Sequence, residues 1–286
     1  MNLEYLSSKK LESYPSGSTL SVYKDQVYIM GDDASSLIIL DTNLKVIDSI
    51  PLFGNDRIRI EKAKKADIES SEWLQRNGKT QLWLFGSGSL SPQRDSAFCF
   101  DPATRKTERV DLADFYEQIN QLGIKVLNIE AATLIDTRLV FGNRGNLKNK
   151  ENYLVFTSAE SFPAAKELSL ILLEMPENAG ISGMTYLAEE DVLLITASEE
   201  NTSSAYDDGE IGESYLGIIN QASEKLSCKK LSMDIWIKLS ALHPDLSGQK
   251  IESVCTFGSG KNQKLLLVSD DDKGGTRLFN FNMIFP

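Results

Sequence analysis

The stretch Ile68-Glu69-Ser70-Ser71-Glu72-Trp73, followed by the apolar run Leu82-Trp83-Leu84-Phe85-Gly86-Ser87, sets the pattern of this chain. An apolar residue or proline comes first, then Ser or Glu, then small residues that lead into a strand. The form occurs five times, and its Ser or Glu positions lie 53, 61, 52 and 70 residues apart at Ser16, Glu69, Glu130, Ser182 and Glu252. A unit that recurs at this spacing predicts a repeat architecture.

Each copy is followed by a run that is apolar throughout, and then by a third strand-like segment. The apolar runs begin at Val27, Leu82, Leu139, Leu193 and Leu265. A strand without polar alternation is typical of one covered on both faces, whereas an alternating outer strand such as 107–112 is half exposed to solvent. Repeated four-stranded sheets of this kind predict an all-β fold, a five-bladed β-propeller formed by residues 1–286 as one domain.

The two ends of the chain predict how the ring closes. The fifth unit has no fourth strand before Pro286, and an extra strand-like segment, 3–11, precedes the first copy. We expect this N-terminal strand to complete the last blade, because closure removes exposed sheet edges. The two long spacings predict helical insertions over 111–122 and 232–242, each with apolar residues on one face. A six-bladed ring is the alternative, although no sixth copy of the motif is present.

Composition limits the partners. Apolar residues make up 41% of the chain, charged residues 25%, and the net charge is −11. So much negative charge disfavours nucleic acid and anionic membranes, while a small anion held by local arginines, or a protein partner, stays open. The segment from Met1 to Lys10 lacks the apolar core of a signal peptide, and no apolar run is long enough to span a membrane. We therefore expect a cytoplasmic protein.

The repeated Ser or Glu opens the innermost strand of each predicted blade, so the five copies are expected to surround the axis. Three carboxylates in one narrow channel repel one another unless a cation or a hydrogen-bond donor neutralises them. Calcium fits such a ring of oxygen ligands, and we predict Ca²⁺ held by Ser16, Glu69, Glu130, Ser182 and Glu252. The alternative is that the glutamates pair with arginines or accept hydrogen bonds from strand N–H groups.

Further charged residues follow the second strands, where a channel mouth would lie. They mix acids with arginines, which hold phosphate or carboxylate groups through paired N–H donors. The predicted ligand-binding residues are Asp32, Asp33, Arg94, Arg144, Asp207, Asp208, Asp270 and Arg277. Each could instead form a turn or a solvated ion pair.

The motifs resemble known propellers. Ser16-Gly17 with Gly31-Asp32-Asp33, and Ile181-Ser182-Gly183-Met184, look like bacterial propellers of the esterase-like phytase and SdiA-regulated groups. The Ser/Glu ring is similar to that of the calcium-activated nucleotidases, or apyrases. That resemblance implies a five-bladed propeller with calcium on the axis, whose ligands would be the five ring residues.

Three functions remain open from the sequence. The first is a calcium-centred propeller that binds a small anionic ligand at the channel mouth. The second is a calcium-dependent hydrolase of phosphate esters or nucleotides, in which the metal activates water. The third is a metal-free scaffold that binds a protein across one face. A Ser-His-Asp hydrolase is poorly supported, because His243 is the single histidine.

Overall fold

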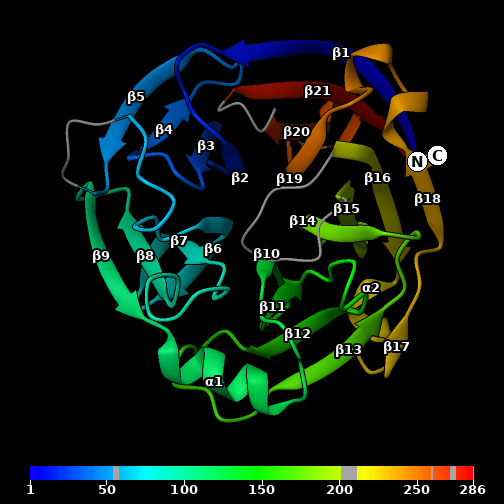
Figure 1. Cartoon of the computed structure of the whole chain (residues 1–286). Coiled ribbons are helices and arrows are strands. Elements are labelled where there is room, and N and C mark those ends of the chain that lie inside the picture. Colours follow the sequence, from blue (N-terminus) through cyan, green and yellow to red (C-terminus); the bar gives the residue numbers. More distant parts are fainter. Residues whose placement is uncertain (54–57, 201–210, 259, 271–274, 286) are drawn as a thin grey trace.

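The fold is a five-bladed β-propeller, as the repeat predicts. The computed structural model describes residues 1–53, 58–200, 211–258, 260–270 and 275–285. Within these residues, five small sheets surround a central axis (Figure 1). Each of the innermost strands, β2, β6, β10, β14 and β19, contacts the innermost strand of the next blade, and β19 returns to β2.

The strands of each blade follow one another from the axis outward. In the first two blades they are β2 (Gly17–Tyr23), β3 (Gln26–Gly31), β4 (Ser36–Leu40), β5 (Val46–Pro51), β6 (Ile68–Arg76), β7 (Lys79–Gly86), β8 (Ser96–Asp101) and β9 (Lys106–Asp111). In the third and fourth they are β10 (Ile129–Ile135), β11 (Arg138–Asn143), β12 (Asn152–Ser158), β13 (Ser169–Leu173), β17 (Lys230–Leu231), β14 (Ala179–Leu187), β15 (Val192–Glu200), β16 (Ile211–Asn220) and β18 (Ile235–Lys238).

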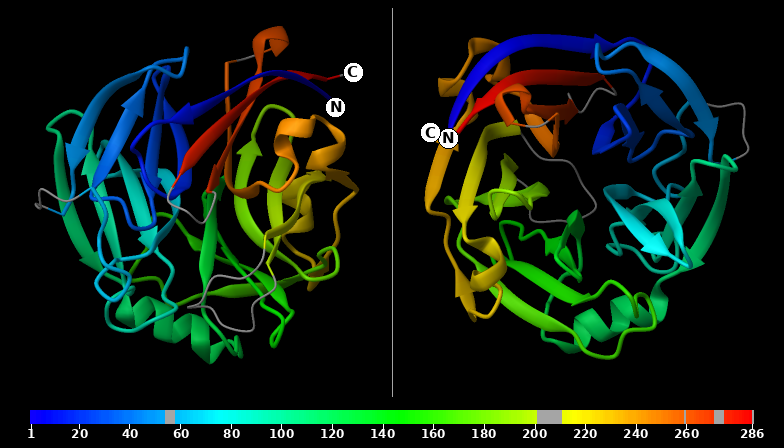
Figure 2. Two further views of the ribbon diagram at one scale, coloured as in Figure 1. Left: turned by 45° about the horizontal axis from the view of Figure 1, so that its top comes forward. Right: turned by 180° about the vertical axis from the view of Figure 1, so that it is seen from behind.

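The fifth blade confirms the predicted closure. It contains β19 (Lys250–Phe257), β20 (Lys264–Asp270) and β21 (Thr276–Ile284). Its outermost strand is β1 (Asn2–Leu11), which pairs antiparallel with β21 along nearly its whole length. The two termini therefore lie beside each other at the rim of the ring (Figure 2).

The core lies between neighbouring blades, and the second strands show why they are apolar on both faces. In β7, Leu82 and Leu84 pack into a cluster with blade 1, whereas Trp83 and Phe85 pack into a cluster with blade 3. Successive side chains of a strand point to opposite faces. A second strand can thus be apolar throughout only because a blade covers each side of it.

One predicted insertion is correct and the other is wrong. Helix α1 (Ala113–Gln121) buries Phe115 and Ile119 between blades 2 and 3, as expected for 111–122. The segment 232–242 is not a helix: β18 pairs with β16 and is followed by a short 3₁₀ turn. Its spaced apolar residues fit either structure, and the unpaired edge of β16 selects the strand. None of the helices in the described ranges is long and apolar enough to cross a membrane.

Candidate functional site at the channel axis

A β-bulge opens the inner strand of every blade. In each blade the pairing register between the first and second strands shifts by one residue near the start of the inner strand. The bulged residues are Ser18, Glu69, Glu130, Ser182 and Glu252. A bulge leaves one residue outside the ladder and redirects its side chain. Four of these five residues are the ones that the repeat singles out.

The fifth position is a correction to the alignment, because blade 1 places Ser18, and not Ser16, at the bulge. The other four blades have isoleucine before the bulge, but blade 1 has Gly17, where an added Cβ would lie 2.5 Å from the Thr276 side chain. Because blade 1 lacks this isoleucine, the sequence pattern aligns Pro15 with the start of the repeat, two residues too early. Ser16 precedes the strand, and its hydroxyl oxygen lies 3.5 Å from Nη2 of Arg59.

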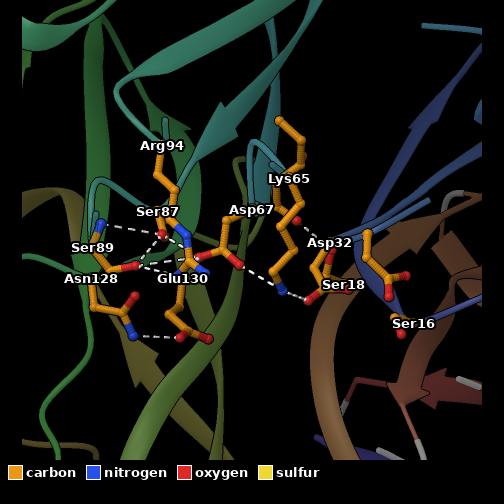
Figure 3. Close-up of polar contacts among 12 residues, drawn as sticks. Ser16, Ser18, Asp32, Lys65, Asp67, Ser87, Ser89, Arg94, Asn128 and Glu130 are labelled. Atoms are coloured by element: carbon orange, nitrogen blue, oxygen red, sulfur yellow. Dashed lines mark hydrogen bonds and ion pairs between the residues drawn. The ribbon is translucent and has the colours of Figure 1, made fainter. Parts of the chain in front are cut away.

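Asp67 is the centre of a buried charged group between blades 1 and 2. Its carboxylate is 2.7 Å from the ammonium of Lys65 and 2.6 Å from Nη1 of Arg94. The Ser87 hydroxyl also donates to it (Figure 3). Lys65 continues to Asp32, with which it forms a second ion pair. Asp67, Lys65 and Arg94 are each at least nine-tenths buried, so these ion pairs are shielded from water.

Three carboxylates in this group come close enough to share one cation. Oxygens of Asp32, Asp67 and Glu69 all lie within 4.8 Å of one another. Burial, followed by the charges of Asp67, Glu130 and Asp32, raises the pKa of Glu69 well above its ordinary value, against the opposing effect of Lys65. Burial also raises the pKa of Asp32, which Lys65 lowers. Oδ1 of Asp32 is buried and has no hydrogen-bond partner in the described part of the chain.

The rest of the ring is neutralised by side chains. Glu130 accepts a hydrogen bond from the Asn128 amide at 2.6 Å and pairs with Arg144 at 3.4 Å. Arg144 reaches across to the Ser198 carbonyl in blade 4. In blade 5, Glu252 lies 3.0 Å from the Lys250 ammonium, and both are largely buried. These contacts match the pairing alternative that the sequence left open.

The group extends toward solvent at Arg59. Its Nε donates to Asp33 at 2.7 Å, and 52% of its side chain is exposed. Asp33, through a hydrogen bond and its charge, raises the pKa of Arg59, with Asp32 and Asp270 adding to the effect. Arg59 is therefore the cation of this group that a dissolved ligand can reach most easily.

The predicted ligand-binding residues divide into three sets. Four of them belong to the charged residues described above, which we call the axial group: Asp32, Asp33, Arg94 and Arg144. Asp270 lies near this group, because its charge acts on Arg59. Arg277 does not join them, because its guanidinium binds Ser8 and Asp245 beside β1. Asp207 and Asp208 lie outside the described residues.

Sequence reasoning missed Lys65, Asp67, Asn128, Lys250 and Arg59. Three of them, Asp67, Asn128 and Lys250, lie two positions before a bulge, so the register of the repeat contains a signal for these three. The residue two positions before each bulge is Ser16, Asp67, Asn128, Gly180 or Lys250. This position is polar in four blades, so a second polar ring precedes the first. Lys65 and Arg59 lie in the loop between β5 and β6, where no repeat marks them.

The charges of the site nearly balance. Six carboxylates face five cations: Asp32, Asp33, Asp67, Glu69, Glu130 and Glu252 against Arg59, Lys65, Arg94, Arg144 and Lys250. Among the described residues, Glu69 is the one member of this set that forms no ion pair within 4 Å. A partly buried carboxyl next to three acids either keeps its proton or needs a further cation. The arrangement thus allows proton binding or cation binding at Glu69.

Solved structures similar to this chain share its fold at low sequence identity. Glutaminyl cyclase of Myxococcus xanthus is 12% identical, with a TM-score of 0.56 over 99% of this chain and 97% of that chain. Virginiamycin B lyase of Staphylococcus aureus is 12% identical, with a TM-score of 0.47 over 99% and 100%. At 12% identity the match to glutaminyl cyclase shows the fold alone. These matches give no support to the specific resemblance to phytase-like propellers or apyrases.

Sequence comparison places the chain in a family. The model described as a family of unknown function, DUF6929, matches residues 13–283, which include all five inner strands. No functionally curated protein matches the chain significantly in sequence.

Proposed function

The chain belongs to the DUF6929 family of unknown function, and we propose that its axial group binds a divalent cation, with calcium as the first candidate. The cation would lie between Asp32, Asp67 and Glu69 at the mouth of the channel. The observation that carries the proposal is the close approach of these three carboxylates, from two neighbouring blades, together with the unpartnered Oδ1 of Asp32. Calcium prefers such oxygen ligands, and the group contains neither His nor Cys.

The spacing of the oxygens supports this choice. Calcium binds oxygen at about 2.3–2.6 Å, so two ligands on opposite sides of the ion lie about 5 Å apart. The three carboxylates already lie within 4.8 Å of one another. Small side-chain rotations would bring them to one ion without backbone movement.

Lys65 is the internal competitor of the proposed cation. Its ammonium pairs with both Asp32 and Asp67, so a bound cation must displace it. Lysine is suited to such an exchange, because its charge is carried on a long flexible side chain. The exchange lowers the affinity of the site, and it would free a positive charge at the channel mouth.

Protonation of Glu69 opposes the cation. Because burial and the neighbouring acids raise the pKa of Glu69, the carboxyl retains its proton to higher pH than an exposed glutamate does. A metal must expel that proton before it binds the carboxylate. We therefore expect calcium affinity to rise with pH.

The proposed ligand beyond the cation is a small anion. Arg59 is half exposed beside Asp33, and Lys65 would lose its two carboxylate partners to the metal. An anionic group that contacts the cation could therefore also pair with these two side chains. The proposed function is ligand binding, and no reaction is assigned.

The test is thermal and urea unfolding of metal-stripped protein with and without calcium. At about 100 times Kd, calcium should raise the free energy of unfolding by about 2.7 kcal/mol through linkage. Glu69→Gln should lose most of this rise. Lys65→Met should be less stable without metal and gain more from calcium, because the competing ammonium is gone.

Glu252→Gln is the matched control. It changes the same residue type at the same bulge position, but in a blade where Lys250 is the partner. This variant should keep the calcium response. Absence of a calcium effect in the wild type, or an equal loss in both variants, would refute the axial cation site and favour the metal-free scaffold.

A further inference from the structure

A groove of about 500 Å³ lies where the ring closes, beside blade 1. It separates the connection between β1 and β2 from the outer strands of blade 1. Its lining residues are Lys9, Lys10, Leu11, Glu12, Ser13, Tyr14, Pro15, Ala34, Ser35, Ser36, Ile38, Val46, Ser49 and Ile58. We call it the closure groove. Its volume is in the range of small-molecule sites, which is about 300–1,000 Å³.

The floor of the closure groove is apolar and firmly held. Leu11, Tyr14 and Ile38 are buried there. The Tyr14 hydroxyl lies within hydrogen-bond distance of the carbonyl oxygens of Ile29 and Ser36, which share its one proton, and it accepts from the Gly31 N–H. These contacts fix the ring against blade 1. Val46 and Ile58 extend the apolar surface, although they are 46% and 60% exposed. An alkyl chain in the groove would remove such apolar surface from water.

The groove is also lined by two lysines and four serines. Among the described residues, no carboxylate lies within 4 Å of the ammonium of Lys9 or Lys10. Ser35, Ser36 and Ser49 line the same groove, and their hydroxyls form no hydrogen bond in that part of the chain. Of the described lining residues, Glu12 is the one acid. In a protein with a net charge of −11, two lysines beside a groove, without an ion pair to any described carboxylate, favour an anionic ligand.

We propose that the closure groove binds a small amphipathic carboxylate with a medium-length alkyl chain. The alkyl chain lies on Leu11, Ile38 and Val46, and the carboxylate lies at the part of the groove that is lined by Lys9 and Lys10. A small polar anion would not contact the apolar floor of the groove, and a neutral hydrocarbon would not pair with the lysines. This site is independent of the axial cation, because it shares no residue with the axial group.

The test is calorimetric titration with sodium hexanoate, octanoate and decanoate, each below its micelle concentration. Affinity should rise about fourfold per added methylene until the chain fills the groove, since each buried CH₂ contributes about 0.8 kcal/mol. Alkyltrimethylammonium salts of equal chain length should bind at least about tenfold more weakly, because the lysines repel them. Equal binding of the two series, or no dependence on chain length, would overturn the proposal.

Two variants and two controls locate the site. Lys9→Gln combined with Lys10→Gln should weaken decanoate binding about tenfold, and Ser49→Trp should weaken it by filling the groove. Lys45→Gln, an exposed lysine next to Val46 that does not line the groove, should leave binding unchanged. Glu69→Gln should also leave it unchanged, which separates this site from the axial one. Binding that survives the first two variants would place the ligand elsewhere and refute the assignment.

Discussion

Glu69 and Glu252 occupy the same bulge in blades 2 and 5, yet their surroundings differ. Glu252 has Lys250 at 3.0 Å, two residues away on its own strand. The corresponding position before Glu69 is Asp67, which adds a negative charge and shares Lys65 with Asp32. The same backbone geometry thus produces a neutral pair in one blade and a carboxyl with no ion pair in the other. Bulge position alone does not make a site, because the neighbouring charges decide its chemistry.

The largest effect on the free energy of unfolding should come from Arg94, the buried cation that pairs with Asp67. Arg94→Met removes a guanidinium that is only 2% exposed and leaves Lys65 as the one cation paired with Asp67 among the described residues. Breaking a buried ion pair from one side costs about 3–5 kcal/mol, and urea unfolding should show a loss of this order. Adding Asp67→Asn should recover part of it, since the unpaired charge is then gone.

The control for Arg94 is the ion pair of Lys79 with Asp101. It spans 3.5 Å, and the lysine is 62% exposed. Lys79→Met should cost less than about 1 kcal/mol, as solvent screens such pairs. Similar losses for the two variants would mean that the axial charges are not shielded from water.

The next prediction concerns the two glutamates directly, in metal-free protein near neutral pH. Glu252→Gln breaks a buried pair with Lys250 and should lower the free energy of unfolding by about 3 kcal/mol. Glu69→Gln removes a buried carboxyl that three acids oppose, and should raise it by on the order of 1 kcal/mol. Chemical unfolding should show a loss of stability for Glu252→Gln and a gain for Glu69→Gln. Changes of the same sign in the two variants would contradict the proposed difference between the blades.

The repeat predicted most of the fold because the core of a propeller lies between blades and therefore recurs in the sequence. The apolar second strands, the closing strand β1 and helix α1 all follow from local patterns that packing reinforces. The helix predicted over 232–242 is wrong, because the apolar spacing of this segment fits a helix and only the free edge of β16 selects a strand instead. Tertiary context overrides a weak local preference there.

The candidate site could be predicted only in part, for a related reason. The bulged glutamates repeat, and so they were found. Lys65 and Arg59 neutralise the acids from a loop that occurs once, and nothing in a single sequence shows that this loop meets Asp32 and Asp33. In blade 1, Gly17 replaces the isoleucine marker because Thr276 occupies the space of its side chain. Contacts between distant segments thus account for both kinds of error.

The smallest effect should be a pH dependence from Glu72, on the same strand as Glu69. Its carboxylate accepts the N–H groups of Trp73 and, in blade 3, Leu134. Burial raises the pKa of Glu72 from 4.5 to about 7, despite the opposing effect of these N–H donors. The folded state therefore binds this proton more tightly than the unfolded state. Its contribution is present at acidic pH and is lost as pH rises from about 4.5 to about 7.

Glu69 changes stability in the same direction, so the Glu72 effect should be measured in the Glu69→Gln background. There, the free energy of unfolding should fall with pH across this window by at least about 1 kcal/mol, because each unit by which folding raises a pKa corresponds to about 1.4 kcal/mol. Adding Glu72→Gln should flatten that slope. A slope that persists without both carboxyls would assign the titration to another group, and the difference between blades 2 and 5 would then not rest on buried acids.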